Sequence, residues 1–228
     1  DVCSSDLQIM ERMTVPLQDM ESNGIFSHEE INSIIRKRRN MEYSLNSYSK
    51  TLQDYLAVIE YEMNLESLRK LRKKKLGVFK ALDSDNSIVG RIIYTFERMV
   101  RKYSGDLNVW LKYVEYCESC NNENRLAGLY PRILQLHPRA ESVWVKAANW
   151  EMSRGNYNNA RLLLQRALRI NHSSKLLWKE YFRFELLYIN VVEERRRILG
   201  LPSLKDRLLG ESKDATLKEL VEEADVKP

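Results

Sequence analysis

Apolar residues recur every three or four positions through most of the chain, which is the period of one face of an α-helix. After Trp144 the pattern continues with Ala147 and Ala148, and after Trp178 it continues with Tyr181. Only 8 glycines and 5 prolines interrupt the 228 residues, which favours long helices over strands and tight turns. The pattern therefore predicts an all-α protein.

Two sets of residues repeat with the same period of 34 residues. The first set is the tryptophans Trp110, Trp144 and Trp178. The second set is the arginines Arg98, Arg132 and Arg166. This period is typical of helix-turn-helix repeats, with a helix A that begins near the tryptophan and a helix B that ends near the arginine. We expect a right-handed solenoid of such hairpins, each burying its apolar face on the next.

The aromatic residues of these hairpins are expected to pack between neighbouring helices. They offer large apolar area and few torsions to freeze, and periodic aromatics are buried far more often than they stack on a ligand. The expected packing residues are Tyr55, Tyr61, Trp110, Tyr113, Trp144, Trp150, Trp178, Tyr181 and Phe184.

Acidic residues recur beside the aromatics of helix A, and arginines recur on helix B. One interpretation is that they form charge-assisted bonds that fix the register of the helices. The other is that they are exposed and unpaired, because surface ion pairs are common and weak. The residues concerned are Glu62, Glu151, Glu185, Arg98, Arg132 and Arg166.

The repeats are expected to occupy residues 51–200, as about four helix pairs of which the last is degenerate. The first pair carries an insertion at about 64–85, with a helix extended to about Leu76 and a loop over 83–87. Residues 8–50 read as an N-terminal helical segment, in which Ser27 and Glu30 form a capping-box signature. Residues 1–7 resemble a translated sequencing adapter. Residues 201–228 are expected to form a charged helix at the end of a fragment.

Positive charge is concentrated in one part of the chain. The net charge is +5, but residues 34–75 hold 11 Lys and Arg against 5 Asp and Glu. Two clusters carry it: Arg36, Lys37, Arg38 and Arg39, and then Arg69, Lys70, Arg72, Lys73, Lys74 and Lys75. A solvated helix face is the common outcome for such clusters. Contact with RNA phosphates or an acidic protein segment is the alternative, and either cluster could be a nuclear address.

The sequence offers no catalytic or metal-binding motif. Cys117 and Cys120 form a C-x-x-C without the second ligand pair that zinc requires. There is no phosphate-cradling glycine loop and no nucleophile elbow. We therefore expect no enzyme activity, cofactor, metal or small-molecule substrate. No apolar run is long enough for a membrane span, and three cysteines do not make a disulfide framework, so we expect an intracellular, reducing location.

Three segments resemble HAT (half-a-TPR) repeats. Residues 160–168, Ala-Arg-Leu-Leu-Leu-Gln-Arg-Ala-Leu, are similar to helix B of that family. Trp144 with Trp150-Glu151, and Trp178 with Phe184-Glu185, are similar to its helix A. The resemblance implies a protein–protein scaffold in an RNA-processing machine. Tyr116-Cys117 replaces the aromatic-Glu pair of the second unit, and Gly200 stands in the arginine register of the fourth, so packing there is in question.

A closer resemblance includes the segment before the repeats. Residues 34–43, 54–65, 68–77 and 178–186 are similar to the N-terminal region of the U3 small nucleolar RNA-associated protein 6 family. The resemblance implies a scaffold of the small-subunit processome in the nucleolus, with other processome subunits, WD-repeat proteins among them, as partners, and with pre-rRNA or U3 RNA as further candidates. A HAT scaffold of splicing or 3′-end processing and a direct RNA-binding protein are the alternatives.

Overall fold

The structure is a computed structural model that describes residues 14–77 and 83–201. In these residues it contains helices and no strand. Residues 14–22 are helical, and the helices that follow are α2 (His28–Asn46), α3 (Leu52–Lys75), the 3-10 helix η1 (Asp83–Asn86), α4 (Ser87–Lys102), α5 (Leu107–Ser119), α6 (Glu123–Leu136), α7 (Glu141–Ser153), α8 (Tyr157–Ile170) and α9 (Lys175–Ile198). The expected all-α fold of helical hairpins is confirmed.

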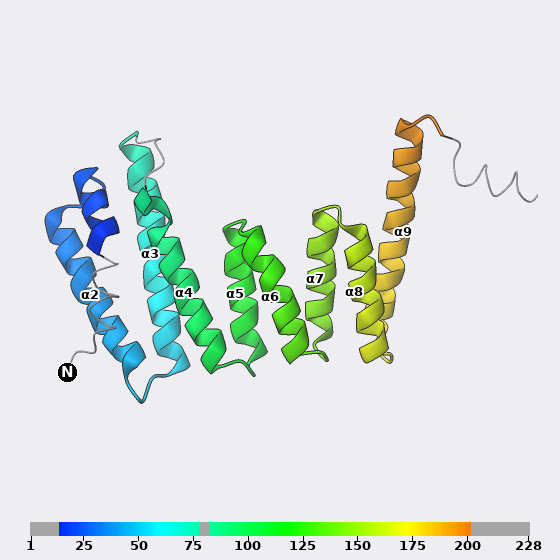
Figure 1. Ribbon diagram of the computed structural model, residues 1–228, viewed down its shortest axis with the longest axis horizontal. Helices are drawn as coiled ribbons and strands as arrows, with labels where there is room; N and C mark the ends of the chain where they lie inside the picture. Colours follow the sequence, from blue (N-terminus) through cyan, green and yellow to red (C-terminus); the bar gives the residue numbers. More distant parts are fainter. Residues whose placement is uncertain (1–13, 78–82, 202–228) are drawn as a thin grey trace, which may run out of the picture. The chain divides into compact units, whose positions relative to one another are not determined.

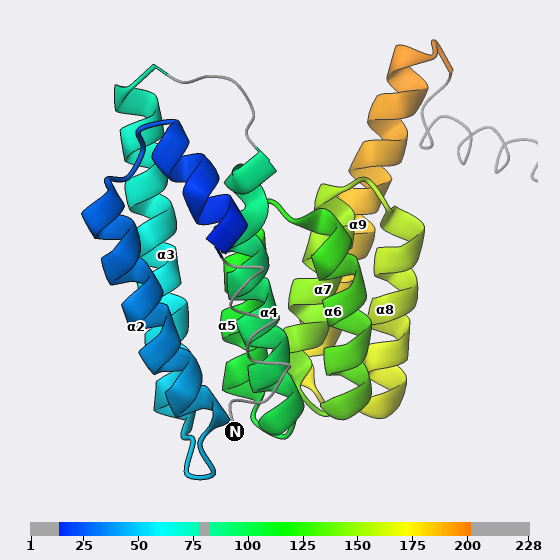
Figure 2. The same cartoon turned by 60° about the vertical axis from the view of Figure 1, so that its left-hand side comes forward.

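The described residues divide into two compact units, one ending at Leu126 and the other beginning at Ala127. In the first unit α2 packs on α3, α3 on α4, and α4 on α5 (Figure 1 and Figure 2). The predicted capping box is present at the beginning of α2. The Ser27 hydroxyl accepts a hydrogen bond from the backbone N–H of Glu30, and the Glu30 carboxylate accepts one from the backbone N–H of Ser27. Thr51 and Asp54 cap α3 in the same way. These reciprocal caps satisfy backbone donors that have no partner within the helix.

The second unit contains α6 from Ala127 onward together with α7, α8 and α9, and the last three pack on one another (Figure 1). Small residues on α7 and α8, Ala148 and Ala160, are fully buried beside Leu164 and Phe184. Gly155, at φ +78°, makes the turn between α7 and α8, a conformation that a residue with a Cβ rarely adopts. His137-Pro138 and Gly155-Asn156 lie between the helices, since α6 ends at Leu136 and α8 begins at Tyr157.

One hydrogen bond repeats with the tryptophans. The indole Nε1 of Trp110 donates to the carbonyl oxygen of Ser104 at 2.9 Å, that of Trp144 to Pro138 at 2.9 Å, and that of Trp178 to His172 at 3.0 Å. Each acceptor lies six residues before its tryptophan, in the turn that precedes helix A. A buried indole needs a partner for its N–H, and the repeat supplies it from the backbone.

Two predictions about the fold are wrong. Trp178 is 54% exposed, whereas Trp110 and Trp144 are 1% and 2% exposed, because no described helix follows α9 to cover its second side. The predicted loop at 83–87 is the 3-10 helix η1 and the first residue of α4. The predicted extended helix is confirmed, as α3 runs to Lys75 with Leu76 as its C-cap. Residues 1–7, and the helix expected within 201–228, lie outside the described residues apart from Leu201.

Candidate functional site

The first unit contains a buried network of ion pairs between α2, α3 and α4. Glu62 is 0% exposed and accepts two hydrogen bonds from Arg38, at 2.8 and 2.6 Å, and one from Arg91 Nε at 2.9 Å. Arg91 also contacts Glu42 at 3.3 Å, and Glu42 pairs with Arg98 at 2.5 Å. Each charge has an opposite partner, which is the condition under which charges are tolerated in a protein interior.

A second cluster lies nearer the C-terminal end of α3. The buried guanidinium of Arg69 makes a bidentate contact with Glu66, at 2.8 and 2.7 Å, and also bonds Asp85. Lys73 bonds the other carboxylate oxygen of Asp85. The Glu66 hydrogen bond is the largest influence that raises the pKa of Arg69. The cluster thus fixes η1 against α3.

Arg72 joins α3 to the segment that enters α2. Its guanidinium makes two 2.7 Å bonds to the carboxylate of Glu30 and one of 3.1 Å to the carbonyl oxygen of Ile25. It also lies 5.0 Å from the centre of the Phe26 ring. The hydrogen bonds from Arg72 and from the Ser27 backbone lower the pKa of Glu30 from 4.5 to about 2.

Changing Glu30 to glutamine should make stability less dependent on acid pH. Because the pKa of Glu30 is lower in the folded protein, its charge stabilises the fold above about pH 4.5, and that contribution is lost as pH falls toward 2. The Glu30 side chain is 41% exposed, so solvent screening limits the effect to about 0.5–1 kcal/mol at neutral pH. Thermal unfolding over this pH range should show the wild type and Glu30→Gln converging on acidification. Glu29→Gln, at an exposed neighbouring position, is the control; a difference that persists at low pH would contradict the assignment.

The predicted basic residues separate into two groups. Arg38, Arg69, Arg72 and Lys73 are committed to carboxylates within the unit, so the expectation that Arg38 and Arg69 offer free surface charge is wrong. The exposed group is Arg36, Lys37, Arg39, Lys70, Lys74 and Lys75. The Lys37 ammonium lies 4.5 Å from the centre of the Tyr61 ring.

The predicted pairing of glutamates with repeat arginines is only partly seen. Glu62 and Arg98 belong to the same buried network but have different direct partners. Glu185 makes a bidentate pair with Arg161, at 2.8 and 2.6 Å. Arg166 is exposed and has no ion pair among the described residues, so its assignment as a structural partner is wrong.

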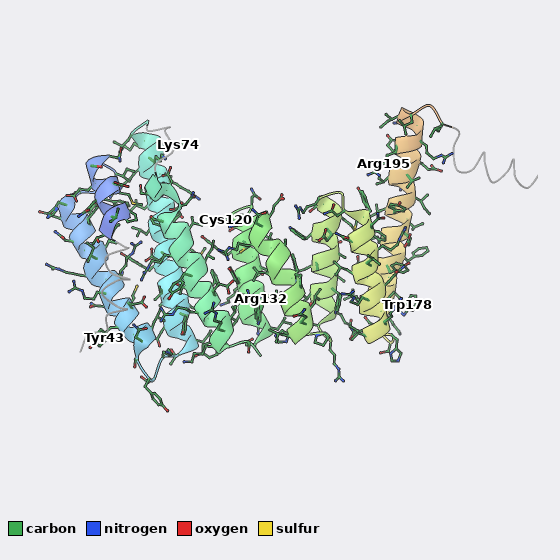
Figure 3. The ribbon with its side chains drawn as sticks, viewed as in Figure 1. Tyr43, Lys74, Cys120, Arg132, Trp178 and Arg195 are labelled. Carbon is green, nitrogen blue, oxygen red and sulfur yellow. The ribbon has the colours of Figure 1, made fainter. Side chains whose placement is uncertain are left out.

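The remaining predicted pair residues lie in the second unit. Glu151 accepts a hydrogen bond of 2.9 Å from the side chain of Asn156. Glu151 and Arg166 both line a cavity of about 400 Å³ together with Trp144 and Trp150. Arg132 is half-buried on α6 (Figure 3).

The sequence analysis did not identify Arg38, Glu42, Glu66, Asp85 and Arg91 as members of buried or half-buried ion pairs. A signal for two of them was present in α2, where the buried positions are Ile31, Ile34, Arg38, Glu42 and Leu45. The spacing of three and four residues continues through the arginine and the glutamate. Charged residues that fall within an apolar stripe and can pair with each other are candidates for a buried network.

Helix α9 presents an apolar stripe to solvent. Its exposed residues Trp178, Phe182, Leu186 and Ile189 are spaced by four, four and three, so they share one helix face. The opposite side is fixed to α8 by Phe184 and by Tyr188, which lies 4.4 Å from the Arg161 guanidinium. Figure 3 marks Trp178 at the beginning of α9. An apolar row of this kind is suited to contact with another protein surface.

Among the described residues, no group of three or more His, Cys, Asp or Glu side chains is placed to hold a metal ion. Burial raises the pKa of the Cys117 thiol to about 12, whereas Cys120 is exposed. No described helix is both long enough and apolar enough to cross a membrane.

Two family models match the chain, and their ranges meet in the middle of α4. Residues 10–94 match the family model described as U3 small nucleolar RNA-associated protein 6. Residues 94–200 match the model of the PRP39 N-terminal HAT repeat. The resemblances inferred from the sequence, to HAT repeats and to the first of these families, are confirmed.

Individual relatives agree with the first match. The chain is 35% identical over 122 residues to the human U3 small nucleolar RNA-associated protein 6 homolog, covering 53% of this chain and 20% of the human protein. It is 36% identical over 130 residues to U3 small nucleolar RNA-associated protein 6 of Schizosaccharomyces pombe, covering 57% of this chain and 27% of the yeast protein. The aligned part is thus between a fifth and a third of either relative's length.

Proposed function

We propose, from the similarity of residues 10–94 to U3 small nucleolar RNA-associated protein 6, that this chain is part of a non-catalytic scaffold subunit of the small-subunit processome. Such a subunit would work in the nucleolus, where it would support processing of pre-18S rRNA and assembly of the small ribosomal subunit. The similarity carries the proposal because it includes helices α2 and α3, which precede the HAT-like segment.

The geometry of each unit supports a role in binding other proteins through its exposed surface. In the first unit, ion pairs across α2, α3 and α4 hold the helices in one register, which gives a partner a rigid surface with little ordering cost. In the second unit, the apolar stripe of α9 supplies aromatic and aliphatic side chains of the kind that anchor protein interfaces. Other processome subunits, WD-repeat proteins included, are the proposed partners.

A HAT scaffold of pre-mRNA splicing or 3′-end processing is the second candidate. The observation in its favour is that residues 94–200 match a HAT repeat from a different family. The first candidate is preferred because the second match leaves α2 and α3 outside its range.

Affinity purification of the tagged chain from nuclear extract, followed by mass spectrometry, should recover U3 particle proteins. The extract is treated with ribonuclease, so that retained proteins are held by protein contacts. Phe182→Ser with Leu186→Ser should lower recovery at least about tenfold, because it removes two apolar anchors from the α9 stripe. Lys179→Ala, at an exposed position on the same helix, should leave recovery unchanged.

The outcomes separate the candidates. Recovery of splicing subunits in place of U3 particle proteins would favour the second candidate. Loss of all U3 particle proteins after ribonuclease treatment would contradict a protein-scaffold role. Equal recovery with the Phe182 and Leu186 variant would exclude the α9 stripe as the contact surface.

A further inference from the structure

The first unit contains a polar groove that the scaffold role does not use. Its volume is about 840 Å³, and it lies between the end of α3, the η1 and α4 junction, and the turn from α5 to α6. Lys74 and Cys120, which both line it, lie at the same end of their helices (Figure 3). The lining residues are Glu66, Arg69, Lys70, Lys73, Lys74, Asp85, Asn86, Val89, Cys120, Asn121, Asn122, Glu123 and Asn124, here called the polar groove.

Cations exceed carboxylates on the α3 side of the polar groove. The carboxylate of Asp85 forms ion pairs with Arg69 and Lys73, and the carboxylate of Glu66 forms an ion pair mainly with Arg69. Lys70 lies 3.5 Å from Glu66, with its side chain 63% exposed. Lys74 is exposed and has no ion pair among the described residues. Lys70 shares the Glu66 carboxylate with Arg69, so the four cations on this side of the groove exceed the two carboxylates, and the excess positive charge favours an anionic ligand.

The wall opposite α3 carries neutral polar groups. Asn121, Asn122 and Asn124 bring side-chain amides, each with two N–H donors and one acceptor. Asn121 adopts φ +50°, a left-handed conformation that asparagine tolerates better than most residues. Glu123 is the one carboxylate on this wall. Lysines facing amides form a surface suited to phosphate and hydroxyl oxygens.

The chemistry of the lining favours a nucleic-acid backbone over a protein segment. Val89 is the aliphatic side chain among the lining residues, and no aromatic ring lines the groove. Protein partners are held chiefly by aromatic and aliphatic anchors in desolvated pockets, which this groove does not offer. The lack of stacking rings also argues against reading of bases. Phosphate and ribose oxygens fit the lysines and amides that are present.

We propose that the polar groove binds the phosphate–ribose backbone of single-stranded RNA, through Lys70, Lys74 and the amides of the α5–α6 turn. This contact is independent of the scaffold role and would hold whichever protein partners the chain has. Binding would be insensitive to base sequence, because the groove offers the bases no stacking platform.

The test uses fluorescence anisotropy with the full 228-residue chain and a labelled oligouridylate of about 16 nucleotides. Lys70→Glu with Lys74→Glu should weaken binding at least about tenfold at about 50 mM salt. It should also make the slope of log affinity against log salt shallower by about 1.4, since each phosphate contact on a single strand contributes about 0.7. Because Lys70→Glu also removes the 3.5 Å ion pair with Glu66, the Tm should fall slightly, by about 4 °C or less, as expected for loss of a partly exposed ion pair.

The matched control is Lys175→Glu with Lys179→Glu, which makes the same change of net charge at two exposed positions on α9. Its RNA affinity should stay within about twofold of the wild type, a change that the altered net charge alone would explain. Arg36→Glu with Arg39→Glu tests the other exposed basic cluster. The proposal is overturned if the wild type does not bind RNA at low salt, or if either of these variants loses as much affinity as the groove variant.

A labelled decaglutamate peptide distinguishes an acidic protein segment from RNA. Binding of the peptide that depends on Lys70 and Lys74 and resists competition by oligouridylate would overturn the proposal in favour of a protein ligand.

Discussion

Replacing Glu62 by alanine should lower the free energy of unfolding by about 3–5 kcal/mol. The carboxylate is fully buried and accepts hydrogen bonds from both Arg38 and Arg91. Its removal leaves the buried guanidinium of Arg38 without the carboxylate that it pairs with, and Arg91 loses one of the two carboxylates that it contacts. Urea unfolding followed by circular dichroism measures the loss.

Two further variants make this result specific. Glu60→Ala, at an exposed position on the same helix, should change stability by no more than about 0.5 kcal/mol. A triple variant, Arg38→Met with Glu62→Leu and Arg91→Met, should recover much of the stability that Glu62→Ala loses, because apolar residues of similar size leave no buried charge unpaired. A loss below about 1 kcal/mol for Glu62→Ala would mean that solvent reaches the network.

Trp144→Ala should destabilise the second unit by about 3–5 kcal/mol, whereas Trp178→Ala should cost about 1 kcal/mol or less. The two residues occupy equivalent repeat positions and make the same indole-to-backbone hydrogen bond, at 2.9 and 3.0 Å. They differ in exposure, 2% against 54%. The cavity left by removing a buried tryptophan accounts for the difference.

The comparison is internally controlled, since both variants delete the same side chain from the same unit. Thermal unfolding of the purified chain gives both values under one set of conditions. Equal losses would show that Trp178 is covered in solution, which would place another surface against the beginning of α9.

Local features of the fold could be predicted because they depend on residues close together in the chain. The capping box of Ser27 and Glu30 requires only a spacing of three residues, and α2 begins and ends where that signal and the apolar period indicate. The turns at 137–138 and 155–156 follow from residues that interrupt a helix. The 34-residue period predicted that the tryptophans occupy equivalent positions, because each repeat packs its helices in the same way.

The identity of the ion-pair partners was decided by the tertiary structure alone. Glu62 pairs with Arg38 and Arg91, which lie 24 and 29 residues away on different helices, and no spacing rule connects them. The same holds for Arg72 with Glu30 and for Arg69 with Asp85. Packing of α2, α3 and α4 decides which members of the basic clusters are committed to carboxylates and which stay available.

The sequence by itself determined the helices, their turns and the kind of repeat, because a helix reports its buried face through the period of its residues. It also determined the family resemblance that guides the functional proposal. The tertiary structure decided which charges are buried, which tryptophan is exposed, and where lysines and amides line one groove. The physical reason is that burial depends on neighbours contributed by distant segments. Trp178 follows the repeat in sequence and in its hydrogen bond, but no helix among the described residues covers it.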